Sequence, residues 1–412
     1  QSTSPTKTCC FHSLSSRVSR NWSRAKKSRN PNQICPFSDR AADQSCILHP
    51  CPTVWSAKSR SSPPNGVGLT QRHPAMNGPR LPGLQALRGL AAVMVLIGHV
   101  LAEAEHYFAL PLPGDALPWT RGVDIFFVIS GFVIALSAQR YIGRPWAFFW
   151  RRLLRVAPLY YVFTTFMVAA LLLLPAAVKD TPLDPAQIIS SYVFFPYARP
   201  DGRIAPVLSL GWTLNYEICF YALTALCLAL SRPLLAVSGL LVSLTALGLT
   251  INFHLPQLIF WTNPLILEFL FGIALARLWQ GGWTRPSPFL CTAALSLSFA
   301  LLIALDPLSL PRFLAAGLPA VLIVAAGTLF CPTRTIPGQL LGDASFALYL
   351  SHRFALRAAT VLLLPLLPTT LLGAWVYVGM TCLIALCFGL LTHLLLERPL
   401  LRGFTHPKAA PA

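Results

Sequence analysis

Apolar positions run almost without interruption from Leu84 to Leu396, in stretches of roughly 17 to 25 residues joined by short polar connections. A helix of that length, rising about 1.5 Å per residue, crosses the roughly 30 Å hydrocarbon layer of a bilayer. The pattern predicts an all-α polytopic membrane protein of about ten transmembrane helices. The predicted spans cover 84–104, 122–139, 156–178, 208–230, 234–252, 257–278, 288–305, 313–331, 341–364 and 370–396.

Basic residues in the connections predict the orientation. Twelve Lys and Arg residues fall on the side of the N-terminus and five on the other, so the positive-inside rule predicts that both termini are cytoplasmic. The five residues expected outside are Arg121, Lys179, Arg199, Arg203 and Arg312.

Composition agrees with a membrane protein and separates off the N-terminal segment. The 412 residues are 55% hydrophobic and 11% charged, which excludes an ordinary soluble domain. Residues 1–80 hold twelve Lys and Arg against Asp39 and Asp43, or +10 of the net +18, so the charge does not indicate nucleic-acid binding. We predict a disordered extension or mis-assigned start over 1–80, a transmembrane domain over 81–400 and a short cytoplasmic tail over 401–412. No CxxC spacing occurs, and no metal site is expected.

The first predicted span carries two ionisable side chains, Arg88 and His99. Such groups are expensive in a bilayer and therefore indicate a functional site. Eleven steps of about 100° return a helix to nearly the same face, and its rise sets the two residues roughly 16 Å apart in depth. One helix face is expected to hold a cation near one membrane surface and an imidazole toward the other.

Asp124 opens the second span at a depth similar to that of His99. Because both residues lie near the outer ends of neighbouring helices, the two side chains are expected to touch. A carboxylate bonded to one imidazole nitrogen fixes the tautomer and makes the other nitrogen a better general base. The alternative is an Asp that faces water at a helix end and a His bonded to a backbone carbonyl.

Three further ionisable groups lie beside or within the next two spans. Arg152 and Arg155 are one helical turn apart, and bidentate donors in that position suit phosphates; the alternative is a basic cluster that sets topology and contacts lipid. Glu217 lies about two turns below the outer surface, at a depth like that of His99, where a carboxyl group is neutral, paired or catalytic.

The ninth span contains a polar stripe. Ser345, Tyr349 and His352 follow one another at spacings of four and three, so they share one helix face. A polar stripe lines a cavity more often than it faces lipid, and these three residues are predicted to bind substrate.

Five motifs in order resemble the acyltransferase 3 family of integral membrane O-acyltransferases. They are a basic residue with His after ten intervening residues, Gly-Val-Asp-x-Phe-Phe-Val-x-Ser-Gly-Phe, Arg-x-x-Arg before Pro-x-Tyr-Tyr, Trp-x-Leu-x-x-Glu-x-x-Phe-Tyr, and Ser-x-x-Leu-Tyr-Leu-x-His. Together they extend from Leu84 to about Pro399. The segments around Glu217 and Glu268 are most similar to exopolysaccharide-modifying acetyltransferases of that family.

The resemblance implies an enzyme of the bacterial inner membrane that uses acyl-CoA, most often acetyl-CoA, as a donor substrate, with no permanently bound cofactor. The donor phosphates would lie against Arg152, Arg155 and Arg88. The acceptor would be a hydroxyl of an exopolysaccharide, a lipopolysaccharide or a related surface or lipid-linked glycan. His99, oriented by Asp124, would deprotonate that hydroxyl or carry the acyl group transiently.

A second hypothesis also fits the spans and their polar stripe: a transporter or permease for a lipid-linked sugar or other small molecule. It predicts that the protein has no acyl-CoA chemistry. A purely structural role is disfavoured by the density of ionisable groups in the spans.

Overall fold

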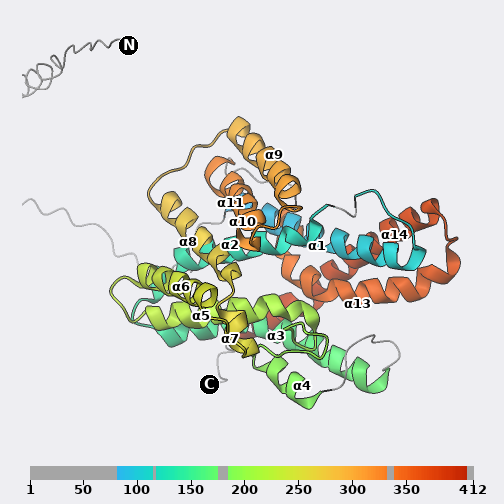
Figure 1. Ribbon diagram of the computed structural model, residues 1–412, viewed down its shortest axis with the longest axis horizontal. Helices are drawn as coiled ribbons and strands as arrows, with labels where there is room; N and C mark the ends of the chain where they lie inside the picture. The colour runs from blue at the N-terminus through green and yellow to red at the C-terminus, as the bar shows by residue number, and fades with distance from the viewer. Residues whose placement is uncertain (1–80, 115–116, 175–183, 332–337, 406–412) are drawn as a thin grey trace, which may run out of the picture. The chain divides into compact units, whose positions relative to one another are not determined.

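The protein is described by a computed structural model over residues 81–114, 117–174, 184–331 and 338–405. Within these ranges the chain is helical and has no β-strand beyond an isolated bridge between Ala198 and Ile204 (Figure 1). The predicted extension over 1–80 and residues 406–412 of the predicted tail lie outside the described residues. The helices are α1 (Pro82–Phe108), α2 (Gly122–Ala138), α3 (Pro145–Leu173), α4 (Pro185–Tyr192), α5 (Trp212–Cys227), α6 (Pro233–Thr250), α7 (Pro256–Trp261), α8 (Leu267–Gln280), α9 (Pro288–Leu305), α10 (Arg312–Ala315), α11 (Gly317–Ala325), α12 (Gln339–Asp343), α13 (Ser345–Leu363), α14 (Leu371–Thr392) and α15 (Arg398–Thr405).

Proline and capping side chains fix many of the helix starts. Six of the helices, among them α1, α3 and α9, begin at a proline, whose fixed φ and missing N–H suit the first helical turn. Ser287 before α9 and Thr370 before α14 each accept a hydrogen bond from a backbone N–H of the first turn. The ends of the apolar runs are therefore defined by local sequence.

Nine of the ten predicted spans correspond to helical segments that are long and apolar enough to cross a membrane. The predicted fourth span corresponds to α5, which has only 16 residues. The third prediction began too late, because α3 starts at Pro145 and includes the turns that carry Arg152 and Arg155. The predicted domain end at residue 400 falls inside α15, which continues to Thr405.

Helix α1 lies between two groups of helices. It contacts α2, which in turn packs against α8 and α11, and it also contacts α12, α13 and α14. In Figure 1 this places α1 between α2 and the α13–α14 pair. Side chains on different faces of α1 therefore reach both groups.

Helices α2 and α8 pack closely at two glycines, each of which faces the backbone of the other helix. A Cβ atom on Gly131 would lie 2.1 Å from the carbonyl oxygen of Phe269, and one on Gly272 would lie 2.1 Å from that of Val128. Small residues of this kind let helices approach closely without a hydrophobic driving force in lipid. This contact fixes α2 and hence Asp124.

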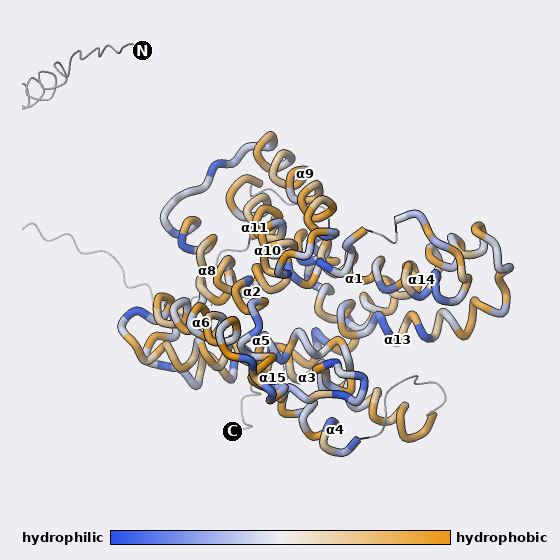
Figure 2. Tube along the Cα trace, in the orientation of Figure 1, coloured by the Kyte–Doolittle hydropathy of each residue, from blue (hydrophilic) through white to orange (hydrophobic). Residues whose placement is uncertain are grey.

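Outer helices show apolar side chains that no protein covers. Only 17% of the most apolar stretch of α9 is buried, compared with 67% for the segment that contains α2. Figure 2 shows hydrophobic colouring along nearly the whole of α9. An exposed apolar helix of this length is what a lipid-facing position requires.

Candidate active site

His99 and His352 form a hydrogen-bonded pair across the α1–α13 contact. The Nδ1 atom of His99 lies 3.1 Å from the Nε2 atom of His352, and the ring centroids are 5.1 Å apart. His352 is almost fully buried, with 1% of its surface exposed, and its Nδ1 lies 2.8 Å and 3.2 Å from the backbone oxygens of Tyr349 and Leu348. Both histidines were predicted from the sequence to belong to the site, but a contact between them was not predicted.

The hydrogen-bond partners of His352 determine the tautomers of both His352 and neutral His99. A carbonyl oxygen only accepts hydrogen bonds, so the Nδ1 atom of His352 carries the proton and its Nε2 atom is the acceptor. His99 must then donate through Nδ1–H. In neutral His99 this arrangement leaves the lone pair of Nε2 available as a general base or nucleophile.

Asp124 is not the partner of His99, and the predicted contact between the two is wrong. The fully buried carboxylate of Asp124 is held by Arg312, with Nε 2.8 Å from Oδ1 and Nη2 2.9 Å from Oδ2. The guanidinium of Arg312 also lies 5.5 Å from the ring centroid of Trp212. Asp124 therefore orients the Arg312 guanidinium, at the start of α10, rather than the imidazole of His99.

Glu217 is also separated from His99. Its Oε1 accepts a hydrogen bond from Ser130 Oγ at 3.0 Å and another from the hydroxyl of Tyr221. The carboxyl group lines a different cavity from the one that contains His99. The two groups line different cavities, although the sequence pattern predicts similar depths for them.

The larger of the two cavities has a volume of about 990 Å³ and a basic wall. Six arginines line it, which are Arg88, Arg140, Arg144, Arg151, Arg152 and Arg155. Glu217 and Glu397 are the acids that line the same cavity, so the charge around it is strongly positive. All three arginines predicted to bind phosphates are in this set.

The position of Arg152 in this wall is fixed by neighbours. Its Nη2 atom donates to the hydroxyl of Ser137, and its guanidinium lies 5.9 Å from the ring centroid of Phe148. A planar guanidinium held on one side leaves its remaining N–H donors for a bidentate partner. This geometry suits a phosphate in the cavity.

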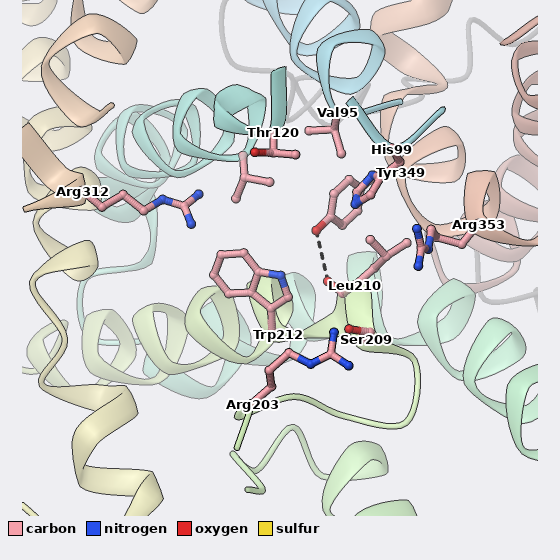
Figure 3. A pocket seen from close by; sticks show the side chains of 11 residues that line it. Val95, His99, Thr120, Arg203, Ser209, Leu210, Trp212, Arg312, Tyr349 and Arg353 are labelled. Atoms are coloured by element: carbon pink, nitrogen blue, oxygen red, sulfur yellow. Dashed lines mark hydrogen bonds between the residues drawn. The ribbon is translucent and has the colours of Figure 1, made fainter. Parts of the chain in front are cut away.

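The smaller cavity, of about 320 Å³, contains His99. Figure 3 shows His99 and Tyr349 at one wall and Trp212 opposite, with Arg203, Arg312 and Arg353 directed toward the space between them. Side-chain and backbone hydrogen bonds from Arg203 lower the pKa of Asp201, so this carboxylate stays ionised beside the cavity. Three guanidinium groups thus face the candidate base.

Two side chains, Val123 and Tyr349, line both cavities. The hydroxyl of Tyr349 donates to the carbonyl oxygen of Leu210 at 3.1 Å and lies 3.0 Å from the hydroxyl of Thr213 (Figure 3). The cavities therefore meet at a wall whose tyrosine is held in place by α5 and the turn before it.

The predicted polar stripe divides into two parts. Tyr349 lines both cavities, whereas His352 is buried, lines neither cavity and contacts the smaller one only through its hydrogen bond to His99. Ser345 is fully buried, and its hydroxyl donates to the carbonyl oxygen of Gly342 at 2.7 Å. It does not line either cavity, so the prediction that Ser345 binds substrate is not supported by its position.

Three features of the site were not predicted from the sequence. Arg312 was assigned to an outer connection, although an arginine at the first position of an apolar helix is a signal that an acid lies nearby. Arg353 directly follows His352 but was given no role. Glu397, at the wall of the larger cavity, is bonded to His393 at 2.6 Å in a π-helical turn, a structure often found at functional sites.

Comparisons with known proteins identify the family of the chain. The family model described as "Acyltransferase domain" matches residues 81–393. The exopolysaccharide production protein ExoZ of Rhizobium meliloti (strain 1021) is 34% identical over 324 residues, which are 74% of this chain and 95% of ExoZ. The acyltransferase MdmB of Streptomyces mycarofaciens is 28% identical over 319 residues, 68% of this chain and 79% of MdmB. No solved structure matches the chain significantly. The chain therefore belongs to the acyltransferase 3 family and is a multi-pass membrane enzyme that transfers acyl groups.

Proposed function

We propose that the enzyme transfers an acyl group from cytoplasmic acyl-CoA to a hydroxyl of a surface glycan outside the bacterial inner membrane. Acetyl is the acyl group proposed. The observation that carries the proposal is the position of His99 in the smaller cavity, which shares Val123 and Tyr349 with a large arginine-lined cavity. The similarity to ExoZ supports an exopolysaccharide or a related glycan as the acceptor.

The donor is proposed to occupy the larger cavity. Coenzyme A carries several phosphate charges, and Arg88, Arg152 and Arg155 supply guanidinium donors for them. The thioester end would extend past Tyr349 toward His99. The distance between Arg88 and His99 along α1 is roughly 16 Å at about 1.5 Å per residue, which the flexible arm of the donor spans.

The acceptor hydroxyl is proposed to bind in the smaller cavity against Nε2 of His99. His99 takes the hydroxyl proton as the hydroxyl oxygen attacks the thioester carbonyl carbon. The carbon–sulfur bond then breaks, and the leaving thiolate takes the proton from His99 to give the free thiol of coenzyme A. His352 keeps its hydrogen bond to Nδ1–H of His99 throughout and acts as a positioning residue.

The first experiment measures the O-acetyl content of surface polysaccharide by proton NMR in a strain that lacks the gene. The strain is complemented with the chain or with its His99→Ala variant, and the amount of each protein in the membrane is compared by immunoblot. Restoration by the chain and not by the variant is expected. Equal restoration by both proteins would refute the role of His99, and unchanged acetylation on deletion would refute a glycan acceptor.

A further inference from the structure

Three arginines from distant segments converge on the smaller cavity. Arg203 comes from the loop between α4 and α5, Arg312 from the start of α10 and Arg353 from α13. A reaction between a neutral hydroxyl and a thioester does not require three cations on the acceptor side. The cavity is also small, near the lower limit of about 300 Å³ for small-molecule sites, so any ligand in it lies close to these guanidinium groups.

Two of the three arginines have a carboxylate partner. Arg312 holds Asp124, and Arg203 is bonded to Asp201, with Nε 2.9 Å from Oδ2. Within the described part of the chain, the Arg353 side chain forms no hydrogen bond or ion pair. Of the three guanidinium groups that line the cavity, that of Arg353 is therefore the one without a carboxylate partner among the described residues.

Arg353 is also close to the reacting groups. It directly follows His352 in α13 and lies one turn beyond Tyr349, and its charge acts on the imidazole of His99. An anion bound to Arg353 is therefore within the length of one or two sugar rings from Nε2 of His99. Arg203 faces the same space from the loop (Figure 3).

The donor phosphates do not account for this charge. They have six arginines in the larger cavity, which Val123 and Tyr349 separate from the smaller one. The charge at Arg353 is therefore available to a second ligand, one that binds in the smaller cavity.

We propose that the acceptor glycan carries an anionic group, a carboxylate or a phosphate, that binds Arg353 and Arg203 while the hydroxyl to be acylated lies at His99. This inference rests on the proposed function. Bidentate guanidinium donors are suited to both anions, and the arrangement selects the sugar residue that is acylated.

The first test locates the O-acetyl group by NMR in the polysaccharide whose acetylation is lost on gene deletion and restored by the chain. A carboxylate or phosphate on the acetylated sugar, or on a sugar linked directly to it, is expected. A repeat unit in which these sugars are all neutral overturns the inference and leaves the proposed function intact. Acetylation that is unchanged when the gene is deleted would instead refute the proposed function, and the inference with it.

The second test uses the purified full chain in phosphatidylcholine vesicles with labelled acetyl-CoA. The acceptors are oligosaccharide repeats from the deletion strain, either unmodified or with their carboxyl groups reduced, or dephosphorylated where the anion is a phosphate. Because a hydrogen bond to a charged group contributes about 1.5 to 3 kcal/mol, kcat/KM should be roughly tenfold to a hundredfold higher for the charged acceptor.

Variants assign that preference to Arg353. In Arg353→Gln the ratio of the two kcat/KM values should fall close to one. Arg357→Gln is the matched control, because Arg357 is one turn further along α13, bonds the hydroxyl of Tyr107 and does not line the cavity. A variant Arg353→Gln that loses activity equally on both acceptors would overturn the inference, since this would indicate a role at the thioester. A preference that disappears when phosphatidylglycerol is added would also overturn it, in favour of a lipid headgroup.

Discussion

The Nδ1 atom of His99 lies 3.1 Å from the Nε2 atom of His352, although 253 positions separate the two residues in the chain. The backbone oxygens that accept from His352 fix the direction of this hydrogen bond, so Nε2 of His99 is the unprotonated nitrogen. Substitution of His99 by Ala should lower acyl transfer by about 10²- to 10⁴-fold, the usual contribution of a general base. The rate of labelled acetyl transfer by the purified protein measures it. His106→Ala, an exposed histidine on the same helix, should keep the wild-type rate.

His352 should affect kcat rather than KM, because it orients His99 and does not touch the donor phosphates. We expect His352→Ala to lower kcat by roughly 10²-fold and His352→Asn to recover part of this loss, since the Asn side-chain oxygen can accept from His99. Steady-state kinetics on both variants decide the matter. Equal activity of Ala and Asn at equal protein abundance would remove the positioning role.

Asp124 should matter for stability more than for chemistry. Asp124 is fully buried and accepts two hydrogen bonds from Arg312, so Asp124→Ala should cost about 1.5 to 3 kcal/mol and unfold at a lower temperature than wild type. The partly exposed pair of Arg121 and Asp306 is the control, for which Asp306→Ala should cost about 1 kcal/mol or less. Thermal unfolding of detergent-solubilised protein compares them. An Asp124→Ala protein that is as stable as wild type and inactive would return Asp124 to a catalytic role.

The larger cavity should distinguish donors by their phosphates. Arg155→Gln and Arg152→Gln should each raise KM for acetyl-CoA by about tenfold while leaving KM for acetyl-pantetheine, which lacks the phosphates, nearly unchanged. Arg277→Gln, an exposed arginine outside this cavity, is the control. A parallel rise in KM for both donors would contradict phosphate binding at these residues.

The spans could be predicted from the sequence because hydrophobic length and positive charge are local properties. Depth along the membrane normal follows from the same count, which is why Arg88 and His99 were expected at different levels. The rotation of one helix against another is not local. It depends on contacts such as that of Gly131 with the Phe269 backbone, which no periodicity reveals.

For that reason the partners of individual side chains were predicted less well than their depth. His99 and Asp124 were predicted at similar depths, yet His99 faces α13 while Asp124 faces Arg312 at the start of α10. Glu217 faces the arginine cavity for the same reason. A guanidinium at the first turn of an apolar helix was the signal that would have indicated the partner of Asp124.

Val123 and the hydrogen-bonded Tyr349 form the wall shared by the two cavities. Under the proposed function, only an acyl group passes this wall, and the nucleotide and the glycan each stay in their own compartment. The same wall, with the Tyr349 phenol anchored at its hydroxyl end, would then also obstruct a column of water along which ions and protons could cross. On that proposal, the bilayer would remain an electrical insulator during turnover, and a cell would modify its outer polymers without discharging its proton gradient.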